Sequence, residues 1–334
     1  MAALACVSLA ALSPTSPGVR PTPYQKATVS FGKEQYAVNL QPSARPSPPR
    51  PPLLLIPPVG VGIDKSFYNR LHSEWQLLGS PAAVHALDLL GTGAATPKPR
   101  RFYSPELWAD QIDDYITSHL KEPCVLVVQG GLLPAALEVW RRSGSRCIAA
   151  ISLLSPLSLS FFSTEEVLSA DPSSKTSNLK SRQPTRERKR DKNLFANAED
   201  VDAEWMANCI TGSRDTRSRF ATFSYLCGSI PAGGAWRDDR LELFDSLTVP
   251  LQLLRGDYVG VENATERAEQ ILARAPQPSR SCSAIIRGSR ACVPYERAPA
   301  TARMLYKFIE THFGESKSRA SSGEENADDV VLLQ

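Results

Sequence analysis

Short apolar runs alternate with amphipathic segments along most of the chain. The runs are continuous and end near glycine, proline or a polar residue, as buried strands do; they cover residues 52–56, 83–90, 124–129, 147–154, 249–254 and 282–286. Between them, apolar residues recur at helical spacing in segments 64–75, 104–116, 131–142, 262–274 and 298–313. Asp64 and Ser104 stand where helix N-caps are expected. Strands alternating with helices predict an α/β fold with a doubly wound, mostly parallel sheet.

The alternation stops between residues 157 and 246. This stretch contains no clear buried strand, and its pattern predicts helices around 201–210 and 216–226. We therefore predict a core in two parts, 51–156 and 247–314, separated by a helical insertion over 157–246. Polar segments at about 172–194 and at 315–334, the second an acidic tail, are expected to be disordered.

The first fifty residues differ in composition from the rest. They contain six serines, eight prolines and five basic residues, but a single acidic residue, Glu34. A Ser-rich, acid-poor leader is typical of an organelle transit peptide. Residues 1–50 are thus expected to be a transit peptide and a Pro-rich linker, directing the protein to a plastid or, alternatively, a mitochondrion. A secretory signal or a plain Pro-rich tail are the other interpretations.

Composition argues against several other classes of protein. The net charge of +3 gives no global signal for nucleic acid or membrane surfaces. No apolar run approaches the roughly 18–20 residues that a membrane span needs. The seven cysteines form no CxxC pair and indicate reduced thiols. The four histidines form no metal-binding motif, so neither a metal nor a cofactor is expected.

The turn between the strand at 124–129 and the next helix is the most informative feature. Residues 128–132 read Val-Gln-Gly-Gly-Leu. Strand, turn and helix in this order resemble the nucleophile elbow, G-x-S-x-G, of the α/β-hydrolase superfamily. The resemblance extends over residues 52–313. Its other landmarks are an oxyanion-type loop at 57–60, a D-x-x-G-x-G turn at 88–93, a lid insertion at 157–246, a strand delivering the triad acid at 254–257, and a G-x-x-H-x-x-x-x-E-like segment at 288–296.

Several segments are similar to a narrower group, the hydrolase-like proteins of cyanobacteria and plastids. In that group the serine and histidine positions are also filled by other residues. The segments that carry this similarity are 54–64 (LLIPPVGVGID), 127–131 (VVQGG), 195–198 (FANA), 201–205 and 293–296 (VPYE).

The departures from the hydrolase pattern bear directly on activity. Gly130 stands at the nucleophile position, and Ala291 stands at the histidine position, or Cys292 if the register slips by one. Asp257 is the one triad member that persists. A lone acid cannot run Ser-His-Asp chemistry, because its role is to orient an imidazole. Asp257 is therefore interpreted as a structural residue that caps a turn.

A binding pocket can persist without the nucleophile. The resemblance implies that backbone N–H groups near Val59, Gly60 and Gly131 point into the cleft, where they would bind a carbonyl or carboxylate oxygen. Gln129 could take part through its amide. Cys292 is the candidate substitute nucleophile, although a thiol needs a neighbouring base or positive charge to react; its other interpretation is a buried, inert cysteine.

A basic segment lies within the predicted insertion. Seven of the thirteen residues from Lys180 to Lys192 are basic. The segment could tether the protein to an anionic partner such as RNA, anionic lipid or an acidic protein surface. The simpler interpretation is a solvated loop.

Three functions remain open from the sequence. The leading hypothesis is a catalytically degenerate hydrolase-like protein, a pseudoenzyme, that binds a small apolar or carbonyl-bearing ligand or a protein partner. The second is an active hydrolase or lyase that acts on an ester or lipid-like substrate through a non-standard site. The third is a scaffold that works through the basic segment alone. Fold by itself does not decide among them.

Overall fold

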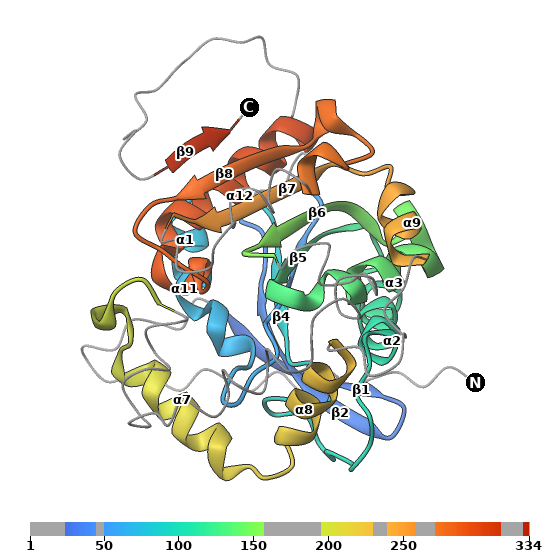
Figure 1. Ribbon diagram of the computed structural model, residues 1–334, viewed down its shortest axis with the longest axis vertical. Helices are drawn as coiled ribbons and strands as arrows, with labels where there is room; N and C mark the ends of the chain where they lie inside the picture. Colours follow the sequence, from blue (N-terminus) through green and yellow to red (C-terminus); the bar gives the residue numbers. More distant parts are fainter. Residues whose placement is uncertain are drawn as a thin grey trace, which may run out of the picture.

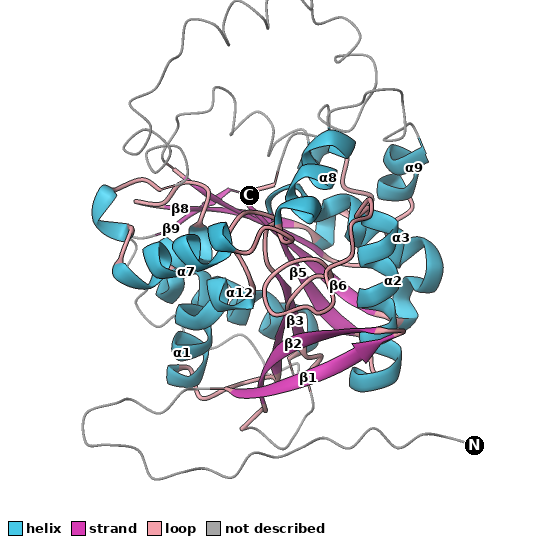
Figure 2. Ribbon diagram, turned by 90° about the horizontal axis from the view of Figure 1, so that it is seen from below, coloured by secondary structure: helices cyan, strands magenta, loops and turns pink. Residues whose placement is uncertain are grey.

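The computed structural model contains one nine-stranded sheet with helices on both faces (Figures 1 and 2). It describes residues 24–44, 50–156, 195–229, 239–257, 271–314 and 330–333. The strands are β1 Gln25–Phe31, β2 Glu34–Gln41, β3 Leu53–Ile56, β4 Val84–Leu87, β5 Cys124–Gln129, β6 Ile148–Leu154, β7 Leu251–Gly256, β8 Cys282–Ile286 and β9 Val330–Leu333.

The strand order is β1-β2-β4-β3-β5-β6-β7-β8-β9. Pairing is parallel from β4 through β8 and antiparallel for the pairs at the two edges. The predicted mostly parallel sheet is therefore confirmed. Because parallel strands share one direction, the loops after β3, β5, β7 and β8 all leave the sheet at the carboxyl ends of its strands.

Two layers of helices cover the sheet (Figure 1). One face packs against α2, α3 and α9, and the other against α1, α11 and α12. Their bounds, with those of two further helices, are α1 Asn69–Leu77, α2 Pro105–Tyr115, α3 Leu133–Ser143, α7 Ala203–Arg214, α8 Arg219–Ser229, α9 Asp239–Asp245, α11 Val293–Glu296 and α12 Ala298–Phe313. Most of the helix expected at 262–274 lies outside the described residues.

Both predicted helix caps are present. The Asp64 carboxylate accepts a hydrogen bond from the Ser66 backbone N–H at 2.7 Å, at the start of a short 3-10 turn that leads into α1. The Ser104 hydroxyl accepts from the Leu107 N–H at 3.3 Å at the start of α2. Each cap satisfies a backbone donor that the first helical turn leaves without a partner.

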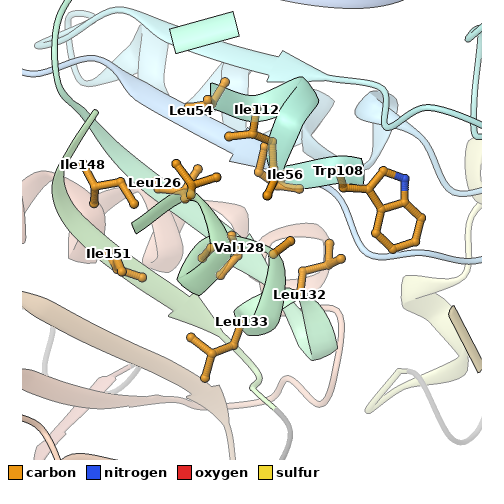
Figure 3. Close-up of a cluster of buried hydrophobic side chains, with 14 of the residues drawn as sticks. Leu54, Ile56, Trp108, Ile112, Leu126, Val128, Leu132, Leu133, Ile148 and Ile151 are labelled. Carbon is orange, nitrogen blue, oxygen red and sulfur yellow. The ribbon is translucent and has the colours of Figure 1, made fainter. Parts of the chain in front are cut away.

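The central strands are buried on both sides, which explains their continuous apolar sequences. Along β5, Leu126 and Val128 belong to the core cluster beneath α2 and α3, whereas Val125 and Val127 belong to the cluster beneath α1 and α12. Figure 3 shows the first of these clusters. Successive side chains of a strand alternate between faces, so a strand covered on both faces needs apolar residues at every position.

The N-terminal boundary of the core lies earlier than expected. Residues 25–41 form the β1–β2 hairpin, and β2 pairs with β4. Tyr36 and Val38 are fully buried. The prediction that residues 1–50 are a transit peptide and linker is therefore wrong for residues 25–41. The Pro- and Ser-rich flanks of this segment masked the alternating apolar residues at 29, 31, 36 and 38.

The part of the predicted insertion that the structure describes is helical, with α7 and α8 close to the expected ranges. An aromatic cluster attaches its first segment to the core. Trp205 of α7 lies 4.8 Å from Phe195, 5.1 Å from Tyr295 and 6.3 Å from Phe67, measured between ring centroids. The basic segment at 180–192 lies outside the described residues, and the boundaries of the insertion stay a prediction.

The C-terminal tail contributes one strand. β9 pairs antiparallel with β8 and forms the edge of the sheet. The expectation of a disordered tail is corrected for residues 330–333, because an apolar Val-Val-Leu-Leu sequence suits an unpaired sheet edge. Among the helices in the described ranges, none combines the length and the apolar character that crossing a membrane requires.

Candidate functional site

The strand–turn–helix at the end of β5 has the geometry of an elbow without the nucleophile. Gly130 follows β5 directly and has a φ of +64°. A short turn, Gly130–Leu132, then leads into α3. A positive φ strains residues other than glycine. A Cβ placed on Gly130 would meet no atom of the described residues within 4 Å, so the side of the turn where a nucleophile would project is open.

Ala291, at the position that the hydrolase resemblance gives to the histidine, lies beside the end of β5. The buried side chain of Gln129 donates a hydrogen bond from Nε2 to the backbone carbonyl of Ala291, with 2.5 Å between the two atoms. Its Oε1 is buried and accepts no hydrogen bond within the described part of the chain. The structure thus joins the loop at Ala291 to the end of β5, one residue before Gly130. Neither Gly130 nor Ala291 carries a reactive side chain.

Asp257, at the position of the triad acid, accepts a hydrogen bond from the backbone. Asp257 directly follows β7, and its Oδ1 accepts a hydrogen bond from the Gly288 N–H at 2.7 Å. Gly288 begins the loop that leads to Ala291. The same loop packs tightly on the end of β7, because a Cβ on Gly256 would lie 2.1 Å from the Ser289 carbonyl oxygen. Asp257 therefore holds the loop where a triad acid would orient an imidazole.

A second carboxylate, Glu296, fixes the same loop from its other end. Its Oε2 accepts hydrogen bonds from the N–H groups of Arg290 at 2.9 Å and Cys292 at 3.2 Å. Its Oε1 accepts from the Ala196 N–H at 2.6 Å. Burial raises the pKa of Glu296, and these three donors oppose that rise. Glu296 was not among the predicted site residues, although it stands at the end of the 288–296 pattern.

Cys292 does not have the surroundings of a nucleophile. Its side chain is buried in the core cluster beneath α1 and α12. Burial raises the pKa of its thiol well above the usual range, and the charge of Glu296 raises it further. A protonated, inaccessible thiol reacts poorly. The interpretation of Cys292 as a buried, inert cysteine fits this environment.

The four histidines lie elsewhere in the fold. His72 on α1 pairs with Gln41 at 3.0 Å, and His85 on β4 pairs with the Tyr115 hydroxyl at 2.7 Å. Burial lowers the pKa of His72 to about 3 and that of His85 to about 4. His119 packs on the Tyr115 ring, and His312 packs on Phe308. None of these contacts reaches the turn at Gly130.

The loop after β3 lies at the same carboxyl end of the sheet as the turn at Gly130. β3 ends at Ile56, which pairs with Val128 of β5, so Val59 and Gly60 follow at the same edge as Gly130. Val59 is half-buried and packs against the first core cluster. Val59, Gly60, Gln129 and Gly131 thus share one end of the sheet. That their N–H groups point toward one ligand stays a prediction.

α7 crosses this loop at a contact between two glycines. A Cβ on Gly212 would lie 2.2 Å from the Cα of Gly62, and a Cβ on Gly62 would lie 2.5 Å from the Cα of Cys209. The backbones therefore touch directly, which only glycine permits at both positions. This contact could not be predicted, because nothing in the sequence around either glycine indicates its partner.

Asp88 holds the neighbouring turn. Its carboxylate is fully buried and accepts hydrogen bonds from the Lys65 N–H at 2.9 Å, the Lys65 ammonium at 3.0 Å and the Ala94 N–H at 2.8 Å. A Cβ on Gly93 would collide with this carboxylate at 2.5 Å. The D-x-x-G-x-G sequence therefore ties the loop after β4 to the 3-10 turn that leads into α1. No group of three histidine, cysteine or acidic side chains suited to a metal occurs among the residues that the structure describes.

No protein-family model and no curated protein sequence matches the chain. Solved structures with a similar fold include a serine hydrolase involved in carbazole degradation, at 18% identity and a TM-score of 0.63 over 86% of this chain and 99% of that chain. A haloalkane dehalogenase variant from Bradyrhizobium elkanii has 15% identity and a TM-score of 0.63 over 88% and 99% of the two chains. An esterase from Thermogutta terrifontis has 15% identity and a TM-score of 0.59 over 86% and 99%. The chain has the α/β-hydrolase fold.

Proposed function

We propose that this protein is a catalytically degenerate member of the α/β-hydrolase fold that binds a small, apolar, carbonyl-bearing ligand at the turn around Gly130. One observation carries the proposal. The elbow keeps its positive φ and its open side while it lacks any side chain that could attack a substrate. Ala291, beside it, supplies no imidazole to act as a base.

The chemistry of the ligand follows from the groups at the carboxyl ends of β3 and β5. Backbone N–H groups near Val59, Gly60 and Gly131 are donors that would suit a carbonyl or carboxylate oxygen. Leu132 and Leu133, labelled in Figure 3, belong to the apolar cluster directly behind the turn. A ligand with one oxygen acceptor fits these donors, and we propose an apolar chain for the rest of it.

The alternative of an active hydrolase or lyase needs a substitute nucleophile. Cys292 is the candidate closest in sequence to the histidine position, and its burial and raised thiol pKa argue against that role. Asp257 is engaged by the Gly288 backbone. No observation among the described residues favours this alternative.

We also propose a plastid location, with a mitochondrion as the alternative. The support is compositional: residues 1–23, which precede the β1–β2 hairpin, are rich in alanine and contain no acidic residue.

Ligand binding can be tested by filling the open side of the turn. The probe is 2-nonanone, which carries a carbonyl on an apolar chain and has no bond to hydrolyse, titrated by calorimetry into the chain from residue 24 onward. Gly130→Asn places bulk at the elbow, and asparagine tolerates a positive φ better than most residues. Gly79→Asn is the matched control, since Gly79 also has a positive φ (79°) and open space around its Cβ position, at the end of α1.

The proposal expects wild type and Gly79→Asn to bind alike and Gly130→Asn to bind at least tenfold more weakly. Equal binding by all three proteins would place the ligand elsewhere. Absence of binding by wild type would exclude apolar, carbonyl-bearing molecules as the ligand.

A further inference from the structure

A cavity lies away from the turn around Gly130. Its volume is about 460 Å³, and it lies between the loop after β4 and the start of α8. Four of the side chains that line it are basic: Lys98, Arg100, Arg217 and Arg219. None of the positions 129–131, 257 or 288–292 lines this cavity, so it is separate from the site described above.

Lys98 holds the wall of the cavity in place and adds no net positive charge to it. It is nearly buried, and its ammonium donates hydrogen bonds to the Asp215 carboxylate, to the Ser218 hydroxyl at 2.8 Å and to the Gly93 carbonyl at 2.5 Å. The Asp215 carboxylate also accepts from the backbone N–H groups of Arg217 at 3.0 Å and Ser218 at 3.4 Å. The charges of Lys98 and Asp215 therefore cancel, and this pair ties the loop to the turn before α8.

The carboxylate of Asp215 is committed to these donors. Burial alone would raise the pKa of Asp215, but the hydrogen bonds from Lys98, Ser218 and Arg217 outweigh it and lower the pKa to about 2. Asp215 stays ionised at neutral pH and is occupied by Lys98. It is thus not available to neutralise the arginines.

The three arginines leave the cavity strongly positive. Arg100, Arg217 and Arg219 are exposed, and no carboxylate within the described ranges forms an ion pair with any of them. Arg217 and Arg219 stand two residues apart at the start of α8, an eleven-residue helix whose N-terminus adds a partial positive charge. Like charges held at the rim of one cavity repel each other unless an anion lies between them.

Arg100 is oriented by an aromatic ring. The central carbon of its guanidinium lies 5.3 Å from the centre of the Phe220 ring, which itself packs against the first core cluster. A guanidinium that lies over a ring keeps its N–H groups free at the edge, in the fork geometry that matches phosphate oxygens. The cavity therefore offers one guanidinium group held over a ring and two exposed ones.

We propose that this cavity binds a small molecule that carries a diphosphate group. In a diphosphate ester the terminal phosphate carries about 1.5 to 2 negative charges near neutral pH and the inner phosphate carries one, so the group balances the three arginines. Arginine binds phosphate through paired hydrogen bonds, and the N-terminus of α8 adds the anion preference of helix ends. Inorganic pyrophosphate and an organic diphosphate ester share this chemistry.

The test is calorimetric titration of the full chain with inorganic pyrophosphate and, separately, with ADP as a diphosphate ester, both in EDTA and about 100 mM salt. The variants are Arg217→Ala/Arg219→Ala and Arg100→Ala. The matched control is Arg214→Ala, which removes the same charge from an exposed position at the end of α7 outside the cavity. Circular dichroism checks that each variant is folded, which is expected for exposed arginines.

The proposal expects at least tenfold weaker binding in the double variant, weaker binding in Arg100→Ala, and a change of less than twofold in Arg214→Ala. Tighter binding of ADP than of pyrophosphate would identify an ester as the preferred source, and equal binding would identify the diphosphate group alone. Two results would overturn the proposal: wild type that binds neither probe at 1 mM, or binding that all variants retain. The second would place the anion elsewhere, such as the basic segment at 180–192.

Discussion

The side-chain amide of Gln129 donates a hydrogen bond to the backbone carbonyl of Ala291 across 2.5 Å. This contact joins the end of β5 to the loop after β8. In the hydrolase pattern these two places carry the nucleophile and the histidine that activates it. Here the turn after β5 carries Gly130, which has no side chain, and the loop after β8 carries Ala291, whose side chain is a methyl group. Under the proposed function, this contact belongs to the scaffold of a catalytic site whose reacting groups are absent.

The β1–β2 hairpin should be required for a stable fold. A chain that begins at Pro51 loses the pairing of β2 with β4 and the buried side chains of Tyr36 and Val38. Burial of one large side chain contributes about 1.5–3 kcal/mol, so we expect this truncation to aggregate or to melt at least 10 °C below the chain that begins at Tyr24. Thermal melts followed by circular dichroism compare the two. Equal melting temperatures would show that the hairpin is dispensable.

Gly212→Ala should weaken the attachment of α7. In an ordinary helix this change stabilises by about 0.5–1 kcal/mol. Here the new Cβ would lie 2.2 Å from the Cα of Gly62, so the helix has to shift, at a typical cost of about 1–3 kcal/mol. Thr211→Ala, at an exposed neighbouring position, is the control. We expect faster amide hydrogen exchange across α7 in Gly212→Ala alone; unchanged exchange would mean that the two backbones are not in contact.

Glu296→Gln should loosen the loop that carries Ala291. The carboxylate accepts three backbone donors through its two oxygens, and an amide replaces one acceptor oxygen with a donor. Leaving buried N–H groups unpaired costs about 1–3 kcal/mol. Glu242→Gln removes the same charge at an exposed position on α9 and serves as the control. Urea unfolding should show the loss only for Glu296→Gln, and equal stability of the two variants would refute this role.

Stability should fall as the pH drops below about 6.5. His72 and His85 have folded-state pKa values of about 3 and 4, lowered by burial, whereas an unfolded histidine has a pKa of about 6.5. Between pH 6.5 and about 4 the unfolded chain therefore binds more protons than the folded one, and the free energy of unfolding decreases as pH falls. The slope is up to about 1.4 kcal/mol per pH unit for each histidine.

Urea unfolding at pH 7.0, 6.0 and 5.0 at fixed ionic strength measures this slope. His72→Gln should reduce it by about one proton, whatever the variant does to stability at pH 7. A slope that does not change in the variant would show that His72 titrates normally in the folded state.

Much of the fold could be predicted from local sequence. The apolar runs gave the buried strands because strands covered on both faces need apolar residues throughout, as Val125 to Val128 show. Asp64 and Ser104 marked two helix starts through their capping chemistry. The β1–β2 hairpin was missed because the prolines and serines around it dominated the composition of residues 1–50.

The parts of the site that could be predicted are those that a continuous sequence motif marks. The turn at Gly130 could be located because strand, glycine and helix follow each other in the chain, whereas the meeting of Gly62 with Gly212 joins segments 150 residues apart and leaves no local sign. The pairing of Lys98 with Asp215, which leaves the charges of the neighbouring arginines exposed, is likewise a tertiary contact. Sequence patterns report local structure and motif order, and they do not report which distant backbones touch.

Hydrolysis of p-nitrophenyl acetate, butyrate and octanoate by the chain from residue 24 onward tests the central claim most directly. With Gly130 at the elbow and Ala291 beside it, we predict no turnover above buffer and no burst of p-nitrophenol. Turnover that is abolished by Asp257→Asn or Cys292→Ala would contradict the account and identify a working site of another design.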